Sequence, residues 1–259
     1  MEDTTKPLIL VTNDDGIFAK GLRELVKAVG DLGEVVVVAP DKPQSGKSHS
    51  VTLDSPLWYM PAKIEFAERA YKCTGTPSDC VKIALFRIIG RRPDIILSGI
   101  NHGSNSSVNI LYSGTMGAAM EGALHNIPSI GFSLIDFTPE SDFTTAGIYA
   151  KLITSKVLSN PPASNICLNV NIPYSQPENI KGIRITRQCA GEWKEDFVKY
   201  THPSNKRPYY WLTGEYTNLE PNADDTDEWA LSHGYVSVQP VMSDCTNYAV
   251  INKMNGIFE

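Results

Sequence analysis

Four short polar segments of this chain carry residue types that can do chemistry. The first, Asn13-Asp14-Asp15-Gly16, directly follows the continuous apolar run Leu8–Val11. Two adjacent carboxylates repel each other, so ionising both at the tip of a strand costs free energy unless a cation lies beside them. A hard divalent cation removes that cost by taking oxygen ligands. On the dipeptide alone, a polar turn with solvated acids competes with this metal-site interpretation.

The second segment, residues 41–50, follows the apolar run Val35–Ala39 and is dense in hydroxyl groups. Its Gly46-Lys47-Ser48 resembles the end of a phosphate-binding P-loop. That motif needs a glycine where Asp41 stands, and it should follow the first strand, so we exclude a P-loop NTPase. No Gly-x-Gly-x-x-Gly follows the first strand, which argues against a dinucleotide-binding enzyme. Taken alone, the segment is most simply a flexible polar loop.

The third and fourth segments could bind a cation and an anion respectively. Residues 98–105 follow the run Ile95–Leu97 and contain asparagines, whose neutral carbonyl oxygens can bind a cation. A simple turn is the competing interpretation, because Gly and Asn both tolerate left-handed conformations. Ser113-Gly114-Thr115 opens a predicted helix, where free N–H groups and the helix dipole favour an anion. Ordinary capping by Ser113 competes with that interpretation.

Alternating strand and helix signals position these four segments. Repetition of strand, helix and strand predicts an α/β fold with a mostly parallel sheet and right-handed crossovers. Ligands bind beyond the carboxyl ends of such strands, so the four segments converge on one edge of the sheet and together predict a divalent metal site that faces a phosphate. The spacing predicts strands over about 8–11, 35–39, 94–98, 129–134 and 166–172, and helices over about 22–29, 76–89, 116–125 and 144–158.

The chain changes character after about Gly182. Residues 224–228 are typical of an acidic helix start, and residues 235–239 alternate like a strand. We expect one domain, 1–259, made of an α/β core (1–182) and a C-terminal β-rich arm (183–259) that mediates oligomerisation. Aromatic residues cluster in the arm with turn residues between them: Trp193, Phe197, Tyr200, Tyr209, Tyr210, Trp211 and Tyr216.

Composition narrows the function classes. The 259 residues are 42% hydrophobic and 20% charged, which is typical of a globular protein. A net charge of −6 argues against coating long nucleic acid or an anionic membrane. Five scattered cysteines without Cys-x-x-Cys favour a reducing compartment. Without a basic apolar leader or a run of roughly 18 apolar residues, we expect a soluble, cytoplasmic protein with no membrane partner.

The motifs together resemble the SurE (survival protein E) family. The resemblance runs in order along nearly the whole chain, and the joint pattern is very specific. It rests on these segments: Val11-Thr12-Asn13-Asp14-Asp15-Gly16, residues 39–46, Gly75-Thr76-Pro77-Ser78-Asp79-Cys80-Val81, residues 98–105, Tyr112-Ser113-Gly114-Thr115, Asp225-Thr226-Asp227 and Gly234-Tyr235-Val236-Ser237-Val238.

The resemblance implies a Rossmann-like core and a 5′/3′-nucleotidase that uses one divalent cation per subunit, usually Mg or Mn. It also implies homodimers or homotetramers that exchange the C-terminal arm. By motif, the metal ligands are Asp14, Asp15, Ser45 and Asn101, of which Asp14 and Asp15 are also the catalytic pair, and the phosphate is held by Asn105, Ser113, Gly114 and Thr115. Departures are confined to Lys42-Pro43 and Lys47, which leave the ligand types intact.

The resulting hypothesis is metal-dependent hydrolysis of nucleoside monophosphates to nucleoside and phosphate. Attack by a water molecule that the cation activates and formation of an aspartyl-phosphate on Asp14 both fit the residues. A metal-dependent phosphate-binding or regulatory module without turnover is the alternative function. The sequence leaves open the preferred base, the 5′ or 3′ position, activity on polyphosphate, the metal used in the cell, and dimer against tetramer.

Overall fold

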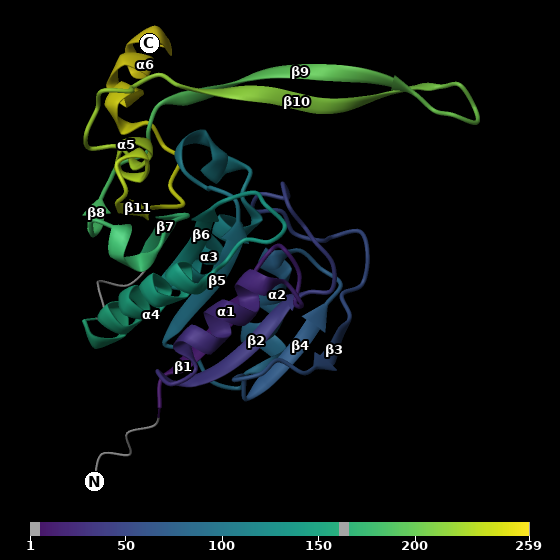
Figure 1. Cartoon of the computed structure of the whole chain (residues 1–259), viewed down its shortest axis with the longest axis vertical. Coiled ribbons are helices and arrows are strands. Elements are labelled where there is room, and N and C mark those ends of the chain that lie inside the picture. The colour runs from purple at the N-terminus through teal and green to yellow at the C-terminus, as the bar shows by residue number, and fades with distance from the viewer. Residues whose placement is uncertain (1–5, 161–165, 259) are drawn as a thin grey trace.

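A nine-stranded sheet forms the centre of the computed structural model, which describes residues 6–160 and 166–258 (Figure 1). Its strand order is β3-β4-β2-β1-β5-β6-β7-β11-β8, and the six strands from β4 to β7 run parallel. This confirms the predicted mostly parallel α/β sheet. The strands are β1 (Leu8–Thr12), β2 (Glu34–Pro40), β3 (Tyr59–Ala62), β4 (Arg69–Cys73), β5 (Ile95–His102), β6 (Ser129–Ile135), β7 (Cys167–Pro173), β8 (Ile183–Ile185) and β11 (Val236–Val241).

Helices cover both faces of the sheet. Helices α1 (Lys20–Val29) and α4 (Thr144–Ser159) pack on one face, and α2 (Pro77–Ile83) and α3 (Gly114–Leu124) pack on the other. Along β1, Ile9 faces the first pair of helices and Leu10 the second, and both are fully buried. Burial on both faces explains why the central strands are continuous apolar runs rather than alternating ones.

The helix predicted over residues 76–89 begins as expected and ends differently. Thr76 and Asp79 form a reciprocal capping box, with Pro77 in the first turn. The chain is helical to Ile88, close to the predicted end near Ile89, but α2 ends at Ile83 and the last part is a π-helical turn, η1 (Ala84–Ile88). There the N–H of Ile89 donates to the carbonyl of Ala84, five residues earlier.

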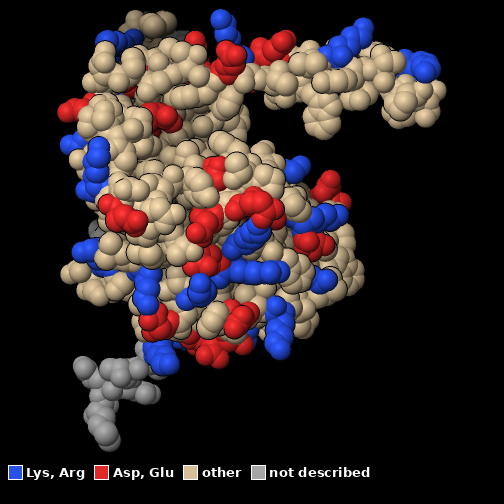
Figure 2. All heavy atoms as spheres, in the orientation of Figure 1, with Lys and Arg blue, Asp and Glu red and all other residues tan. Residues whose placement is uncertain are grey.

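The chain beyond residue 182 divides between the sheet and a projecting hairpin. Strands β8 and β11 extend the main sheet, and α5 (Asp227–Ser232) packs against β7 and β11. Strands β9 (Gly191–Thr201) and β10 (Pro208–Asn218) pair only with each other among the described residues and project from the body (Figure 1). Figure 2 shows a mainly uncharged surface on this hairpin, with Lys and Arg toward its tip.

The remaining elements are short. They are the 3₁₀ turns η2 (Ser107–Leu111), η3 (Pro177–Asn179) and η4 (Tyr248–Val250), and the C-terminal helix α6 (Ile251–Phe258). Within the described ranges, none of the helices combines the length and the apolar composition needed to cross a bilayer.

Candidate active site at the carboxyl edge of the sheet

Asp14 lies where the end of β1 meets the start of α3. Its side chain is buried, and the Thr115 hydroxyl donates to Asp14 Oδ1 at 2.6 Å. A Cβ atom on Gly114 would lie 2.8 Å from the Cβ of Asp14, so glycine is what permits this close approach. Burial raises the pKa of Asp14, while hydrogen bonds from Thr115 and the nearby backbone oppose that rise. The helix start that we predict to bind an anion therefore lies against the carboxylate of Asp14.

Asp15 lies beside the exit of β5. The backbone N–H of His102 donates to Asp15 Oδ2 at 3.1 Å. Burial raises the pKa of Asp15 to about 6, and the negative charge of Asp14 adds to the rise. Two neighbouring carboxyl groups therefore resist ionisation in this structure. A positive charge between them would offset both effects by stabilising the ionised forms.

The surroundings of this pair suit a hard cation. Asn13 Oδ1, on the residue before Asp14, is buried without a hydrogen-bond partner in the part of the chain that the structure describes. The carbonyl of Pro40 at the end of β2 accepts a hydrogen bond from the N–H of Ile17, which joins the segments after β1 and at the end of β2. The described residues contain no group of three or more His, Cys, Asp or Glu arranged to hold a metal. A site here would combine two carboxylates with neutral oxygens, which is an oxygen set that Mg²⁺ and Mn²⁺ accept.

Ser45 reaches the same edge on the loop that follows β2. The N–H of Gln44 donates to the backbone carbonyl of Asp14 at 2.7 Å, which fixes the loop beside the first carboxylate. Ser45 itself is exposed. Further along the loop, His49 Nε2 pairs with Glu121 Oε2 of α3 at 2.9 Å. The loop is therefore held at two points, one on either side of Ser45.

Asn101 lies at the end of β5, where the β5–β6 register shifts. A Cβ on Gly99 would lie 2.4 Å from the carbonyl of Phe132, so glycine is needed for the path of β5 next to β6. Asn101 Nδ2 donates to the carbonyl of Gly103 at 2.8 Å. This bond directs the nitrogen away and leaves the side-chain oxygen as the group available to a cation.

The predicted phosphate residues lie in two places. Thr115 and Gly114 adjoin Asp14, and Ser113 Oγ caps α3 by accepting from the N–H of Met116 at 3.0 Å. Asn105 is buried in a network of polar side chains on β6 and β7. Its Nδ2 donates to Ser133 Oγ and its N–H donates to Asn171 Oδ1, both at 2.8 Å.

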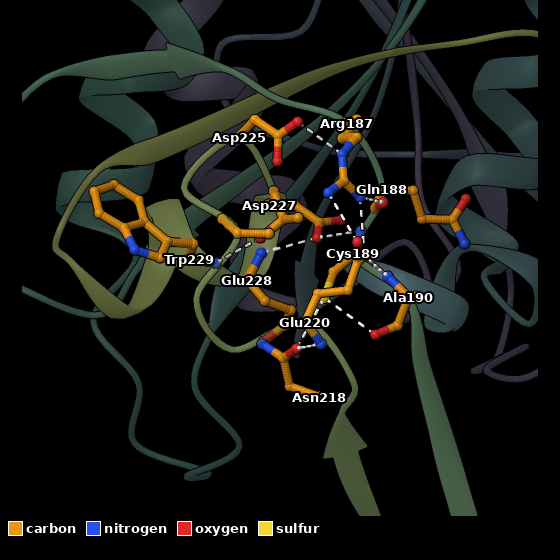
Figure 3. Close-up of polar contacts among 12 residues, drawn as sticks. Arg187, Gln188, Cys189, Ala190, Asn218, Glu220, Asp225, Asp227, Glu228 and Trp229 are labelled. Carbon is orange, nitrogen blue, oxygen red and sulfur yellow. Dashed lines mark hydrogen bonds and ion pairs between the residues drawn. The ribbon is translucent and has the colours of Figure 1, made fainter.

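Sequence reasoning assigned no role to Asp227 or Glu228. Helix α5 starts at Asp227, as the acidic pattern predicted, but Asp227 is fully buried. Its carboxylate accepts from the N–H group of Cys189 at 2.9 Å (Figure 3). It also accepts from the N–H group of Ser107 at 2.8 Å, which links the loop after β5 to the base of the hairpin. Glu228 accepts from the Ser106 hydroxyl. The Asp225-Thr226-Asp227 motif was the available signal, but spacing alone does not show which loop it contacts.

This arrangement can be compared with known proteins. A sequence model of the family described as Survival protein SurE matches residues 9–195, which include the ends of β1, β2 and β5 and the start of α3. The chain belongs to the SurE family. A family member from Phocaeicola vulgatus, named 5′-nucleotidase SurE, is 48% identical over 249 residues, covering 96% of each chain. Another from Christiangramia forsetii, with the same name, is 50% identical over 252 residues, again covering 96% of each.

The fold agrees with a solved SurE-family structure. The crystal structure of the SurE protein from Aquifex aeolicus superposes with a TM-score of 0.83 at 40% identity. The match covers 98% of this chain and 100% of that one. The similarity to the SurE family therefore extends beyond the region 9–195 to the C-terminal strands and the hairpin.

Proposed function

We propose that this chain is a nucleotidase that hydrolyses nucleoside monophosphates to nucleoside and phosphate. The observation that carries the proposal is the contact of buried Asp14, next to half-buried Asp15, with the N-terminus of α3. The two carboxyl groups supply acidic oxygens for a cation, and the start of the helix supplies hydrogen-bond donors for a phosphate. The names of the relatives from Phocaeicola vulgatus and Christiangramia forsetii support the same activity.

Asp14, Asp15, Ser45 and Asn101 would hold one Mg²⁺ or Mn²⁺ ion per subunit. Asp14, Asp15 and Ser45 lie on the loops that follow β1 and β2, and Asn101 lies among the last residues of β5, all at the carboxyl edge of the sheet. When bound, a divalent cation supplies positive charge to the phosphate and its nucleophile. The backbone contacts of Gln44 and His102 hold these loops in place without using the side-chain oxygens of Ser45 and Asn101.

The start of α3 would hold the phosphate. Backbone N–H groups there and the Ser113 hydroxyl would donate to phosphate oxygens and stabilise the charge that develops during transfer. The Thr115 hydroxyl, which donates to Asp14 in this structure, would turn to the phosphate when the nucleotide binds. The Asn105 amide has two hydrogens, and Ser133 takes one of them, so the second can donate to the same phosphate. In hydrolysis, a water oxygen bonds to phosphorus and the ester oxygen leaves with a proton.

Phosphate release tests this function. Purified protein is incubated with nucleoside 5′- and 3′-monophosphates and with Mg²⁺ or Mn²⁺, with or without EDTA. We expect release that EDTA abolishes and that added metal restores. Metal-dependent binding of nucleotide without any release would favour the alternative, a phosphate-binding or regulatory module. Acid quenching of a turnover mixture with labelled phosphate distinguishes an aspartyl-phosphate on Asp14, which retains label, from direct attack by water.

We also propose a homodimer or homotetramer formed through the hairpin of the C-terminal arm. An isolated two-stranded hairpin is marginally stable in water, and this one leaves large apolar side chains such as Phe197, Trp211 and Leu212 exposed. A second copy of the chain would cover them in a closed two-fold contact. Light scattering at micromolar concentration measures the mass, and a monomeric value would contradict the proposal.

A reducing compartment suits the thiols of this chain. Cys73, Cys80, Cys167 and Cys189 are buried free thiols, and Cys245 is an exposed one. We propose that the protein acts in the cytoplasm, where thiols stay reduced. Fractionation of the producing cells tests the location.

A further inference from the structure

A hollow lies between the main sheet and the base of the hairpin. Its volume is about 390 Å³, within the range of small-molecule pockets. It opens beyond the carboxyl ends of β6 and β7, the same side of the sheet as Asp14. The side chains that matter for its chemistry are Ser106, Phe137, Tyr174, Trp193, Tyr216 and Glu228.

The hollow adjoins the predicted phosphate residues. Ser104 and Ser106 line it and flank Asn105 in the chain. Strand β6 is two strands from β1, and neighbouring strands lie about 4.8 Å apart, so the hollow lies on the order of 10 Å from Asp14. A single nucleotide spans that distance between its phosphate and its base.

Aromatic rings give the hollow flat apolar walls. Trp193 and Tyr216 meet edge to face with their centroids 5.9 Å apart, and Trp193 Nε1 donates to Asn109 Oδ1 at 2.8 Å, which fixes the indole ring. Tyr174 and Phe137 are 51% and 77% exposed, so their rings are open to a ligand. Rings of this kind stack on planar heteroaromatic groups.

One carboxyl group gives the hollow a polar recognition point. Glu228 Oε1 accepts from Ser106, and Oε2 has no hydrogen-bond partner within the described residues. Figure 3 shows Glu228 beside Asp227, whose bonds to Ser107 and Cys189 hold this corner together. A carboxylate repels a phosphate, so the hollow suits an uncharged planar group with hydrogen-bonding atoms on its edge.

We propose that this hollow binds the base of the nucleoside monophosphate, an inference that rests on the function proposed above. The phosphate lies at the start of α3, the sugar crosses the loop that carries Asn105, and the base stacks on Tyr174 and Phe137. Glu228 then contacts the edge of the base. The hollow therefore determines which bases are accepted, and its residues are separate from those that carry out hydrolysis.

Steady-state kinetics with and without a base test the assignment. Tyr174→Ala and Phe137→Ala are each assayed on nucleoside 5′- and 3′-monophosphates and on ribose 5-phosphate, which has the phosphate and sugar but no base. We expect KM for nucleotides to rise about tenfold with kcat nearly unchanged, because a stacking contact is lost. KM for ribose 5-phosphate should stay constant. Tyr174→Phe keeps the ring, and Tyr210→Ala removes an exposed ring from the other part of the hairpin, so both should behave as wild type.

Nucleoside binding separates this inference from the proposed function. Adenosine, guanosine, cytidine and uridine are titrated by calorimetry into the wild-type protein and Tyr174→Ala. Binding of any of them that weakens about tenfold in the variant supports the assignment, even if no phosphate is released from any ester. Equal KM changes for nucleotides and ribose 5-phosphate, or no binding of any nucleoside, would overturn it. Absence of all turnover with intact nucleoside binding would count against the nucleotidase proposal alone.

Discussion

Two regions of the molecule differ in how their side chains are covered. The carboxyl groups at the edge of β1 and β5 are covered by this chain, whereas large side chains of the hairpin β9–β10 are exposed. At the edge, Asp14 bonds to Thr115, Asp15 bonds to His102, and both carboxyl groups are largely withdrawn from water. In the hairpin, the two strands pair with each other from Gly191–Asn218 to Thr201–Pro208 and leave their aromatic side chains exposed. The first region is completed within one chain, whereas the second presents a surface that needs another molecule.

Burial of polar groups at the edge and exposure of apolar groups in the hairpin indicate different things about the protein. At the edge, burial places like charges together at a cost in stability, which indicates a function that requires them. In the hairpin, lack of burial leaves apolar area in water, which indicates a partner. Substitutions in the first region should therefore affect chemistry more than folding, and substitutions in the second should affect assembly more than chemistry.

The largest effect is expected at the paired carboxylates. Asp14→Asn or Asp15→Asn should reduce turnover to background and leave the fold intact, since each removes a charge that burial and its neighbour already disfavour. Thermal melting should show an unchanged or higher Tm without added metal. Asp31→Asn, which alters an exposed ion pair with Lys151, is the control and should keep full activity. Near wild-type turnover by either site variant at saturating metal would remove Asp14 and Asp15 from the site.

The next effect concerns the helix start that Asp14 faces. Thr115→Val removes a hydroxyl that donates to Asp14 but keeps the side-chain shape. In the substrate complex that hydroxyl would turn from Asp14 to the phosphate, and loss of one donor at a developing oxyanion costs roughly 3 kcal/mol, so kcat should fall about a hundredfold. Steady-state kinetics with a nucleoside monophosphate measure it. If both kcat and KM were unchanged, the phosphate would have to bind elsewhere.

Glu121 is a buried carboxylate whose neighbours are Lys82 and His49, whereas the neighbour of Asp15 is another carboxylate. Lys82 Nζ lies 2.6 Å from Glu121 Oε1, and His49 pairs with Oε2. Burial alone raises the pKa of Glu121, but the hydrogen bonds from His49 and Lys82 outweigh it and bring the pKa to about 2. The pairing therefore stabilises the fold above the ordinary pKa of 4.5, and this contribution disappears as pH falls toward 2.

Glu121→Gln should lower the free energy of unfolding by about 2 kcal/mol at pH 7, and the gap to wild type should narrow between pH 5 and pH 3. Urea denaturation at several pH values measures this gap. Glu220→Gln is a matched control, because Arg187 also lowers the pKa of Glu220 to about 2, but in an exposed ion-pair network. Its effect should be much smaller, since solvent screens exposed pairs. A constant gap for Glu121→Gln across this range would contradict the assignment.

The smallest effect is expected from one side chain of the hairpin. Leu212 is 59% exposed and lies opposite Phe197. Leu212→Ser should raise the dissociation constant of the oligomer about tenfold, because partial burial of a leucine contributes about 1.5 kcal/mol. Sedimentation over a concentration series measures it. Lys199→Ser on the same hairpin is the control, and an unchanged dissociation constant for Leu212→Ser would place the interface elsewhere.

The sequence predicted the parallel part of the fold well, because each local signal there agrees with the tertiary structure. The apolar run at Leu8–Val11 became β1, and the Thr76 and Ser113 caps begin α2 and α3 as expected. Strands and helices can be predicted from sequence where the local conformational preference of the residues agrees with the tertiary structure. The buried strands also fixed which polar segments share an edge.

The parts that sequence did not reveal depend on long-range contacts. The pairing of β11 with β7 and the contact of Asp227 with Ser107 join residues far apart in the chain, and no periodicity encodes them. The sequence predicted a β-rich arm without strand boundaries in the hairpin region, yet β9 and β10 form one regular ladder of 11 residues each. The π-helical turn after Ile83 also left no signal in the apolar spacing.

The position of β11 also determines when the sheet can be completed during synthesis. This strand lies between β7 and β8, yet β7 ends at Pro173 and β11 begins only at Val236. A ribosome adds roughly 5–20 residues per second, so the edge of β7 waits several seconds for its partner. During that interval, a nascent chain presents an open strand edge and the aromatic hairpin together, both of which favour association with other chains. The interval between the synthesis of β7 and that of β11 is therefore when this protein most needs protection from aggregation.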